Sequence, residues 1–153
     1  MDAAVVNSFV DALVNILETY AVGDIKALKP YLKKGAIATG DISGTLSMAG
    51  ECNGSVAVSF SAQCILGIVS NMFGEEMTEV NDEIKDAVGE MVNMMAGQVN
   101  TKMGELSKTL KAKFDTVYMG KGHAIDHLAG KPVIMMPYKS NVGRFLLEVC
   151  FDG

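Results

Sequence analysis

The longest amphipathic segment of the chain, residues 81–110, constrains the fold more than any other feature. At about 100° per residue, its apolar side chains fall within an arc of about 80°. These side chains are Ile84, Val88, Met91, Met95 and Val99, and the stripe drifts on to Met103 and Leu106. The spacing predicts a long helix with one buried face, beginning at Asn81 as its N-cap, with Asp82 and Glu83 in its first turn. Such a helix needs a broad apolar surface to pack against.

Five other segments have the alternating pattern of strands and supply that surface. They are residues 42–48, 56–60, 113–119, 132–138 and 144–151. A glycine-containing turn at 49–54 predicts that the first two form a hairpin. Two more segments have helical spacing, one over 3–21 that closes at Gly23 and one that begins at Ser61 and ends at Gly74.

The order of these segments predicts the fold class. Hairpins at both ends of a central helix pair favour an α+β fold, with a mostly antiparallel sheet packed against long helices. The length of 153 residues predicts a single domain over 1–153. Residues 25–35 are expected to form a connector or a short edge element.

Composition excludes several classes of function. The formal net charge is −5 and no block of Lys or Arg occurs, so a nucleic-acid partner is not expected. No apolar run reaches the roughly 18 residues that a membrane span needs, and the first helix lacks the pattern of a signal peptide. The three cysteines, Cys52, Cys64 and Cys150, form no CxxC pair. We expect buried thiols in a reducing cytoplasm, although a nucleophilic role beside a histidine stays open.

A second stripe lies about 160° to 180° from the buried face of the long helix. It consists of Asp86, Glu90, Asn93, Gly97 and Asn100, so each neighbouring pair is three or four residues apart and lies within contact. One interpretation is an ordinary solvated face. The other is a docking strip, where a carboxylate pairs with a partner lysine and a carboxamide holds an attacking water. The glycine would leave a notch for close approach of a partner.

The segment Asp86-x-x-x-Glu90-x-x-Asn93, followed by MMAG, resembles the signature of the CheX/CheC/FliY chemotaxis phosphatases, and most closely that of CheX. The likeness extends over nearly the whole chain. It includes VNSFVDALVNILET, ATGDISGTLSM, the long segment from SVAVSF to DAVGE, and VYMGKGHAI.

That resemblance implies a CheC/CheX-like fold and an enzyme that removes the aspartyl phosphate of a CheY-like response regulator. It assigns Asn93 to orienting the hydrolytic water and Glu90 to the regulator's lysine, with Asp86, Gly97 and Asn100 as partner contacts. The chain itself then needs no cofactor, since Mg²⁺ belongs to the regulator. The resemblance also implies a cytoplasmic homodimer.

Two alternatives stay open. The family signature has a proline where this chain has Thr116, which puts the exact docking in doubt, and the fold resembles the middle domain of the flagellar switch protein FliM. The chain could therefore be a non-catalytic binding module for a phosphorylated regulator or a flagellar switch component. Separately, His123 and His127 with Asp126 have the spacing of metal ligands, but no third ligand is evident, so a surface loop is expected.

Overall fold

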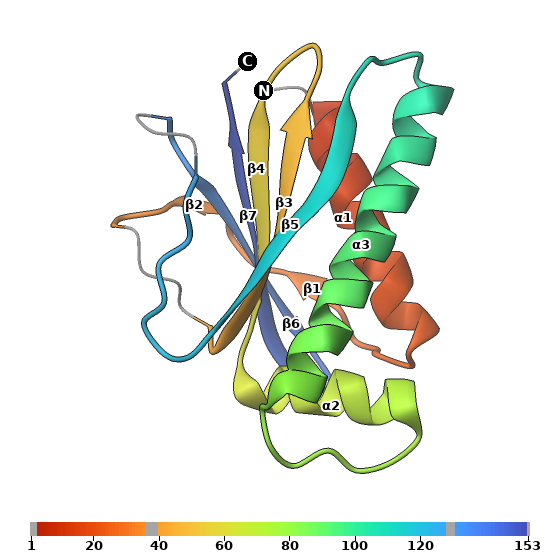
Figure 1. Cartoon of the computed structure of the whole chain (residues 1–153), viewed down its shortest axis with the longest axis vertical. Coiled ribbons are helices and arrows are strands. Elements are labelled where there is room, and N and C mark those ends of the chain that lie inside the picture. The colour runs from red at the N-terminus through yellow and green to blue at the C-terminus, as the bar shows by residue number, and fades with distance from the viewer. Residues whose placement is uncertain (1–2, 36–39, 128–130, 153) are drawn as a thin grey trace.

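The computed structural model describes residues 3–35, 40–127 and 131–152. Within them the chain forms three helices and seven strands (Figure 1). The helices are α1 (Ala3–Thr19), α2 (Ala62–Phe73) and α3 (Asp82–Glu105). The strands are β1 (Lys26–Ala27), β2 (Tyr31–Leu32), β3 (Ile42–Ala49), β4 (Gly54–Phe60), β5 (Lys111–Met119), β6 (Ile134–Ser140) and β7 (Gly143–Phe151).

All seven strands join one antiparallel sheet. Its order is β1-β6-β7-β4-β3-β5, and β2 also pairs with β6. The central strands pair with their neighbours along nearly their whole lengths: β3 with β4 and β5, and β7 with β4 and β6. The predicted α+β class with an antiparallel sheet is confirmed, and residues 25–35 supply the expected edge elements β1 and β2.

The helices cover one face of this sheet. Figure 1 shows α1 and α3 side by side over it, while α2 lies across one end. Side chains from both layers meet in a core that includes Phe9, Phe60, Phe145, Leu13 and Met91, each fully buried. Burial of this apolar surface is the main stabilising term of the fold. No helix among the described residues is both long and apolar enough to cross a membrane.

The helix ends match the predicted caps at most positions. Ser61 accepts a hydrogen bond from the N–H of Cys64 at 3.1 Å, and Gly74 ends α2 at φ 68°. At the end of α1 the left-handed residue is Ala21, at φ 62°, so the helix closes before Gly23.

The long helix is shorter than predicted. It ends at Glu105 rather than near 110, because Ser107 adopts φ 54° and turns the chain toward β5. Leu106 is consequently 39% exposed and does not extend the buried stripe.

Candidate functional site

The helix α3 is fixed at its start by its N-cap. Asn81 Oδ1 accepts hydrogen bonds from the N–H groups of Glu83 at 3.1 Å and Ile84 at 3.2 Å. Asp82 and Glu83 lie in the first turn, where carboxylates interact favourably with the positive end of the helix. The predicted apolar stripe from Ile84 to Met103 is buried as expected. These features set the rotation of the helix, and therefore the direction of its polar face.

A glycine on β3 brings α3 unusually close to the sheet. A Cβ at Gly44 would lie 2.5 Å from Cγ2 of Val92 and 3.1 Å from Cγ1 of Val88. Real Cβ atoms essentially never approach that closely, so only glycine allows this contact. The close approach places the polar face of α3 beside the neighbouring strand β5, with which α3 also packs.

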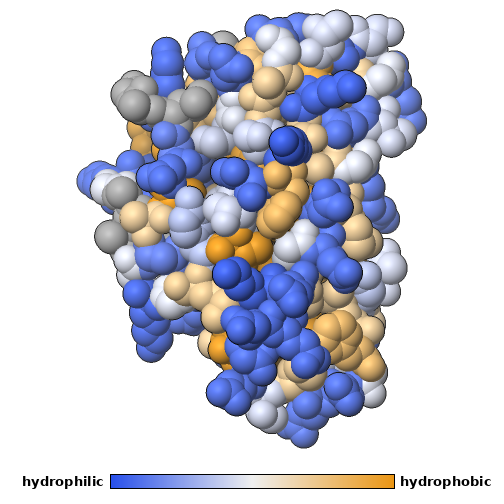
Figure 2. All heavy atoms as spheres, viewed as in Figure 1, coloured by the Kyte–Doolittle hydropathy of each residue, from blue (hydrophilic) through white to orange (hydrophobic). Residues whose placement is uncertain are grey.

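The predicted polar stripe is exposed over its first four members. Asp86, Glu90, Asn93 and Gly97 are all solvent-exposed. The side chains of Asp86, Glu90 and Asn93 make no hydrogen bond or ion pair with any residue that the structure describes. Their polar atoms are therefore available to a partner. Figure 2 shows hydrophilic surface gathered over the first half of α3.

These residues border a groove between α3 and β5. The groove has a volume of about 650 Å³. Its lining residues on the helix are Lys85, Asp86, Gly89, Glu90 and Asn93, and those on the strand are Phe114, Asp115, Thr116 and Val117. The structure thus brings three of the sequence-predicted residues together with Thr116, which lies 23 positions after Asn93 in the chain. The helix side is polar, with a lysine, two carboxylates and a carboxamide, whereas the strand side combines the apolar Phe114 and Val117 with the polar Asp115 and Thr116.

Thr116 is held by a buried threonine on the adjacent strand. Thr45 Oγ1 accepts a hydrogen bond from the N–H of Thr116 and donates one to its carbonyl oxygen, both at 3.1 Å. The register of β3 and β5 shifts at this point, between Gly44 and Leu46. A proline at 116 would lack the N–H that Thr45 accepts. In this chain a hydrogen bond therefore fixes the strand where the family signature has a rigid ring.

The last member of the predicted stripe has a different role. Asn100 Nδ2 donates to the carbonyl of Ala112 at 2.9 Å, and its Oδ1 accepts from the N–H of Ala112 at 2.7 Å. Because both ends of the carboxamide are occupied by the backbone of β5, Asn100 fastens the helix to the edge of the sheet. Its carboxamide is thus engaged within the fold, and the expectation that Asn100 contacts a partner stays a prediction. A Cβ at Gly97, by contrast, would meet nothing within 4 Å, so the expected notch is open.

The two histidines lie on the sheet face opposite α1 and α3, in the segment between β5 and β6. The side chain of His127 is only 6% exposed, so it points into the protein rather than out from a surface loop as expected. His123 hydrogen-bonds with Ser43 Oγ at 2.7 Å and with the carbonyl of Gly120 at 2.6 Å. No cluster of three or more potential metal ligands occurs within residues 3–35, 40–127 and 131–152.

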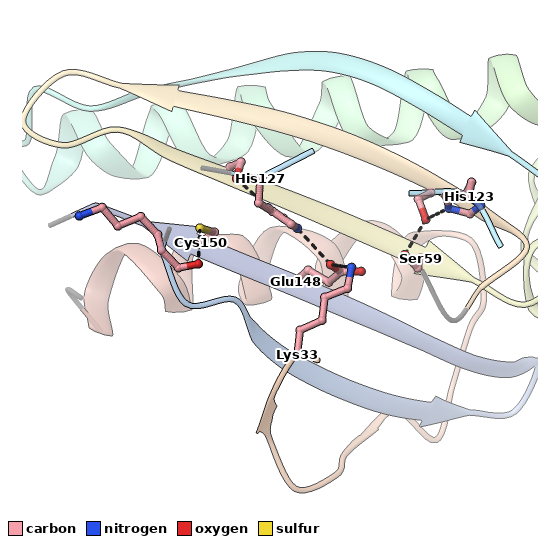
Figure 3. Close-up of polar contacts among 9 residues, drawn as sticks. Lys33, Ser59, His123, His127, Glu148 and Cys150 are labelled. Carbon is pink, nitrogen blue, oxygen red and sulfur yellow. Dashed lines mark hydrogen bonds and ion pairs between the residues drawn. The ribbon is translucent and has the colours of Figure 1, made fainter. Parts of the chain in front are cut away.

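The buried partner of His127 is a carboxylate that sequence reasoning missed. Glu148 on β7 is fully buried, and its Oε1 lies 3.0 Å from His127 Nε2 and 2.7 Å from Lys33 Nζ (Figure 3). His127 Nδ1 in turn lies 2.7 Å from Ser55 Oγ. Burial alone would raise the pKa of Glu148, but the hydrogen bonds and charges of His127 and Lys33 hold it below its usual value. A lone acid within the apolar run FLLEVCF was the signal available in the sequence.

The cysteines take no part in the groove. Cys64 and Cys150 are buried and Cys52 is half-buried, and none of the three forms a disulfide. Burial raises the pKa of the Cys64 thiol to about 12, which keeps it protonated at neutral pH. A protonated, buried thiol is a poor nucleophile, so the structure gives Cys64 a packing role.

The chain is similar in sequence and in structure to known chemotaxis proteins. The family model described as "Chemotaxis phosphatase CheX" matches residues 42–139. The curated protein "CheY-P phosphatase CheX" of Thermotoga maritima is 27% identical over 122 residues, which are 79% of each chain. The crystal structure of chemotaxis protein CheX from Vibrio vulnificus is 37% identical, with a TM-score of 0.85 over 98% of this chain and 100% of that one.

A more distant solved structure shares the fold. It is the CheX–CheY–BeF3–Mg²⁺ complex from Borrelia burgdorferi, 20% identical with a TM-score of 0.72, and the alignment covers 97% of each chain.

Proposed function

We propose, from the premise that this chain belongs to the CheX chemotaxis phosphatase family, that it hydrolyses the aspartyl phosphate of a CheY-like response regulator. The related protein of Thermotoga maritima is described as acting on CheY-P, and the Borrelia burgdorferi protein was crystallised with CheY. The groove between α3 and β5 is the proposed docking site.

The observation that carries the proposal is the state of three side chains. Asp86, Glu90 and Asn93 are exposed, lie along one side of the groove, and have no hydrogen-bonding partner among the described residues. The two other amides on α3 are engaged, since Asn100 binds Ala112 and Gln98 accepts a hydrogen bond from Asn15. A polar strip without partners among the described residues, next to the exposed groove along β5, fits a surface that another protein completes.

The proposed chemistry divides between two residues. Asn93 carries a carboxamide, which donates and accepts hydrogen bonds and so can hold a water in line with the phosphorus. Phosphoryl transfer depends mostly on such positioning and on charge stabilisation. Glu90, one turn earlier, would pair with the regulator's lysine and fix the orientation of the two proteins. The Mg²⁺ ion would be the regulator's, so this chain supplies no metal ligand.

Because the substrate is a response regulator, we place the reaction in the cytoplasm. We propose one groove per chain, since α2 carries no Glu-x-x-Asn motif. We also propose a homodimer, which rests on the family resemblance alone. Asp86 and Gly97 extend the docking strip at either end of the catalytic pair.

The docking role of Glu90 gives the first test. In Glu90→Ala the regulator's lysine loses its charged partner, so affinity for the beryllofluoride-activated regulator should fall roughly tenfold, as for loss of one charge-assisted hydrogen bond. Titration calorimetry on the wild type and the variant measures this. The matched control is Glu105→Ala, at the far end of α3, which should bind like the wild type. Equal affinity of Glu90→Ala and the wild type would remove the assigned role.

A second candidate is a binding module that holds the phosphorylated regulator without hydrolysing it. Thr116 in place of the family proline favours it, because the strand beside Asn93 is then fixed differently. Measuring both regulator binding and the rate of phosphate loss distinguishes the two functions. Saturable binding with no faster loss of phosphate would establish the binding module.

A further inference from the structure

Three cations lie abreast on the sheet face that α1 and α3 leave uncovered. Lys26 on β1 is directly opposite Lys139 on β6, and Lys139 is directly opposite Arg144 on β7. Residues opposite one another share a face, with Cβ atoms about 5 Å apart. All three are exposed, and none forms an ion pair with a residue in the described part of the chain. Like charges placed in this way destabilise a sheet, and they stand out in a chain of net charge −5.

A cavity opens beside the Arg144 end of this row. Its volume is about 450 Å³, within the range of small-molecule sites. Leu146 on β7 lies opposite both Pro137 and Ser59, so these three side chains form adjacent parts of the lining on the same face. Leu28 and Tyr31, from the segment that carries β1 and β2, also line the cavity. A mostly apolar cavity is thus bordered by a guanidinium that forms no ion pair with any residue that the structure describes.

One of the two serines in the lining, Ser59, already has an oriented hydroxyl group. Ser59 Oγ lies 2.6 Å from Ser43 Oγ, which lies 2.7 Å from His123 Nε2. Ser59 belongs to the lining, so a hydrogen bond from a ligand would join an existing chain of polar groups. The lining therefore offers a cation from Arg144, two serines (Ser59 and Ser61) and apolar contacts from Leu28, Pro137 and Leu146.

We propose that this cavity binds a small amphipathic anion. The ligand would carry one carboxylate or phosphate group against Arg144, and a ring or short acyl chain over Leu146, Pro137 and Tyr31. Electrostatics favours this occupant over a second copy of the chain, because a two-fold contact through this face would set the cation rows against one another. The proposal is independent of the phosphatase function, since no residue of this cavity lines the groove on α3.

The test uses the full chain labelled with ¹⁵N and two anions, 4-phenylbutyrate and phenyl phosphate. Each is titrated beside an uncharged counterpart, 4-phenylbutyramide or phenol, while backbone amide shifts are followed by NMR. We expect saturable shifts at Ser59, Leu146 and Arg144, with the uncharged compounds bound about tenfold more weakly. The variant Arg144→Ala should lose about tenfold in affinity for the anions and little for the uncharged compounds.

Matched variants separate the site from general charge effects. Lys111→Ala removes an exposed lysine at the start of β5, outside the row and the cavity, and should leave anion affinity unchanged. Lys139→Ala should weaken anion binding, since its charge lies next to Arg144. Lys111, Lys139 and Arg144 are all exposed and form no ion pair with the described residues, so each variant should fold.

Three results would overturn the proposal. The first is the absence of saturable shifts at these amides with both anions. The second is equal anion affinity of the wild type and Arg144→Ala. The third is a change of oligomeric state in Arg144→Glu, measured by sedimentation, with no anion bound. That outcome would assign the face to contact between copies of the chain.

Discussion

At the scale of single residues, the molecule holds two carboxylates in opposite environments. Glu90 is exposed beside the groove and has no ion pair with the described residues, whereas Glu148 is fully buried between Lys33 and His127. The sequence predicted the first, because helical spacing placed it beside Asn93. It did not predict the second, because the contact with Lys33 joins residues 115 positions apart. An alternating strand pattern shows which face a residue takes, but not which distant charge covers it.

Glu148 should control stability in acid. Its pKa is lowered in the folded state, so its contribution is present above the ordinary value of 4.5 and is lost as pH falls through the lower folded value. Glu148→Gln should cost about 3 to 5 kcal/mol, because it leaves the Lys33 charge buried without its partner. Urea unfolding at neutral pH and down to pH 3 measures both effects. The variant should lose less stability on acidification than the wild type; parallel curves would contradict this account.

At the scale of elements, α3 determines where the site lies. Its caps and its two stripes follow from local spacing, so the sequence predicted the helix and the exposure of Asp86, Glu90 and Asn93. The partner strand was not predictable in the same way. Thr116 reaches the groove only because Gly44 lets the helix settle close to β3 and because β5 lies at that edge of the sheet. Asn100 has the spacing of the stripe, but its carboxamide forms hydrogen bonds with the backbone of Ala112 on β5.

Substitution of Asn100 tests whether this residue stabilises the fold, in contrast to Asn93, which is proposed to act on a partner. Asn100→Ala removes both hydrogen bonds to Ala112, which is 5% exposed, and leaves its backbone groups unpaired. The expected loss is about 1 to 3 kcal/mol in the free energy of unfolding, measured with urea. Asn93→Ala is the control, because that side chain has no internal partner and should change stability by less than about 0.5 kcal/mol. Equal stability of the two variants would contradict the assigned roles.

Gly97 gives a second prediction on the same helix. A Cβ there meets nothing within 4 Å, so Gly97→Ala should stabilise the chain by about 0.5 to 1 kcal/mol through helix propensity alone. If the notch admits the regulator, the same change should weaken regulator binding. Gly104→Ala is the control for regulator binding. A Cβ at Gly104 is also unobstructed, but this residue lies in the last turn of α3, away from the docking strip. Thermal melts and calorimetry give the two readouts; undiminished regulator affinity in Gly97→Ala would remove the notch from the docking strip.

At the scale of the whole molecule, the sheet separates two surfaces of different character. The helix layer carries the acidic and amide strip on α3, and the opposite face carries the row of cations and its cavity. Periodicity predicted the class of fold and the antiparallel hairpins, because both depend on neighbours in sequence. The strand order β1-β6-β7-β4-β3-β5 depends on long-range pairing, so it emerged only from the structure, together with everything on the opposite face.

The central claim is that Asn93 positions the water that removes phosphate from a CheY-like regulator. The most direct test follows the loss of phosphate from CheY, labelled with acetyl phosphate, alone, with the wild-type chain, and with Asn93→Ala. The account predicts faster loss with the wild type and at least about a 10²-fold smaller acceleration with the variant, while the regulator still binds. Full acceleration by Asn93→Ala, or no acceleration by the wild type, would contradict it.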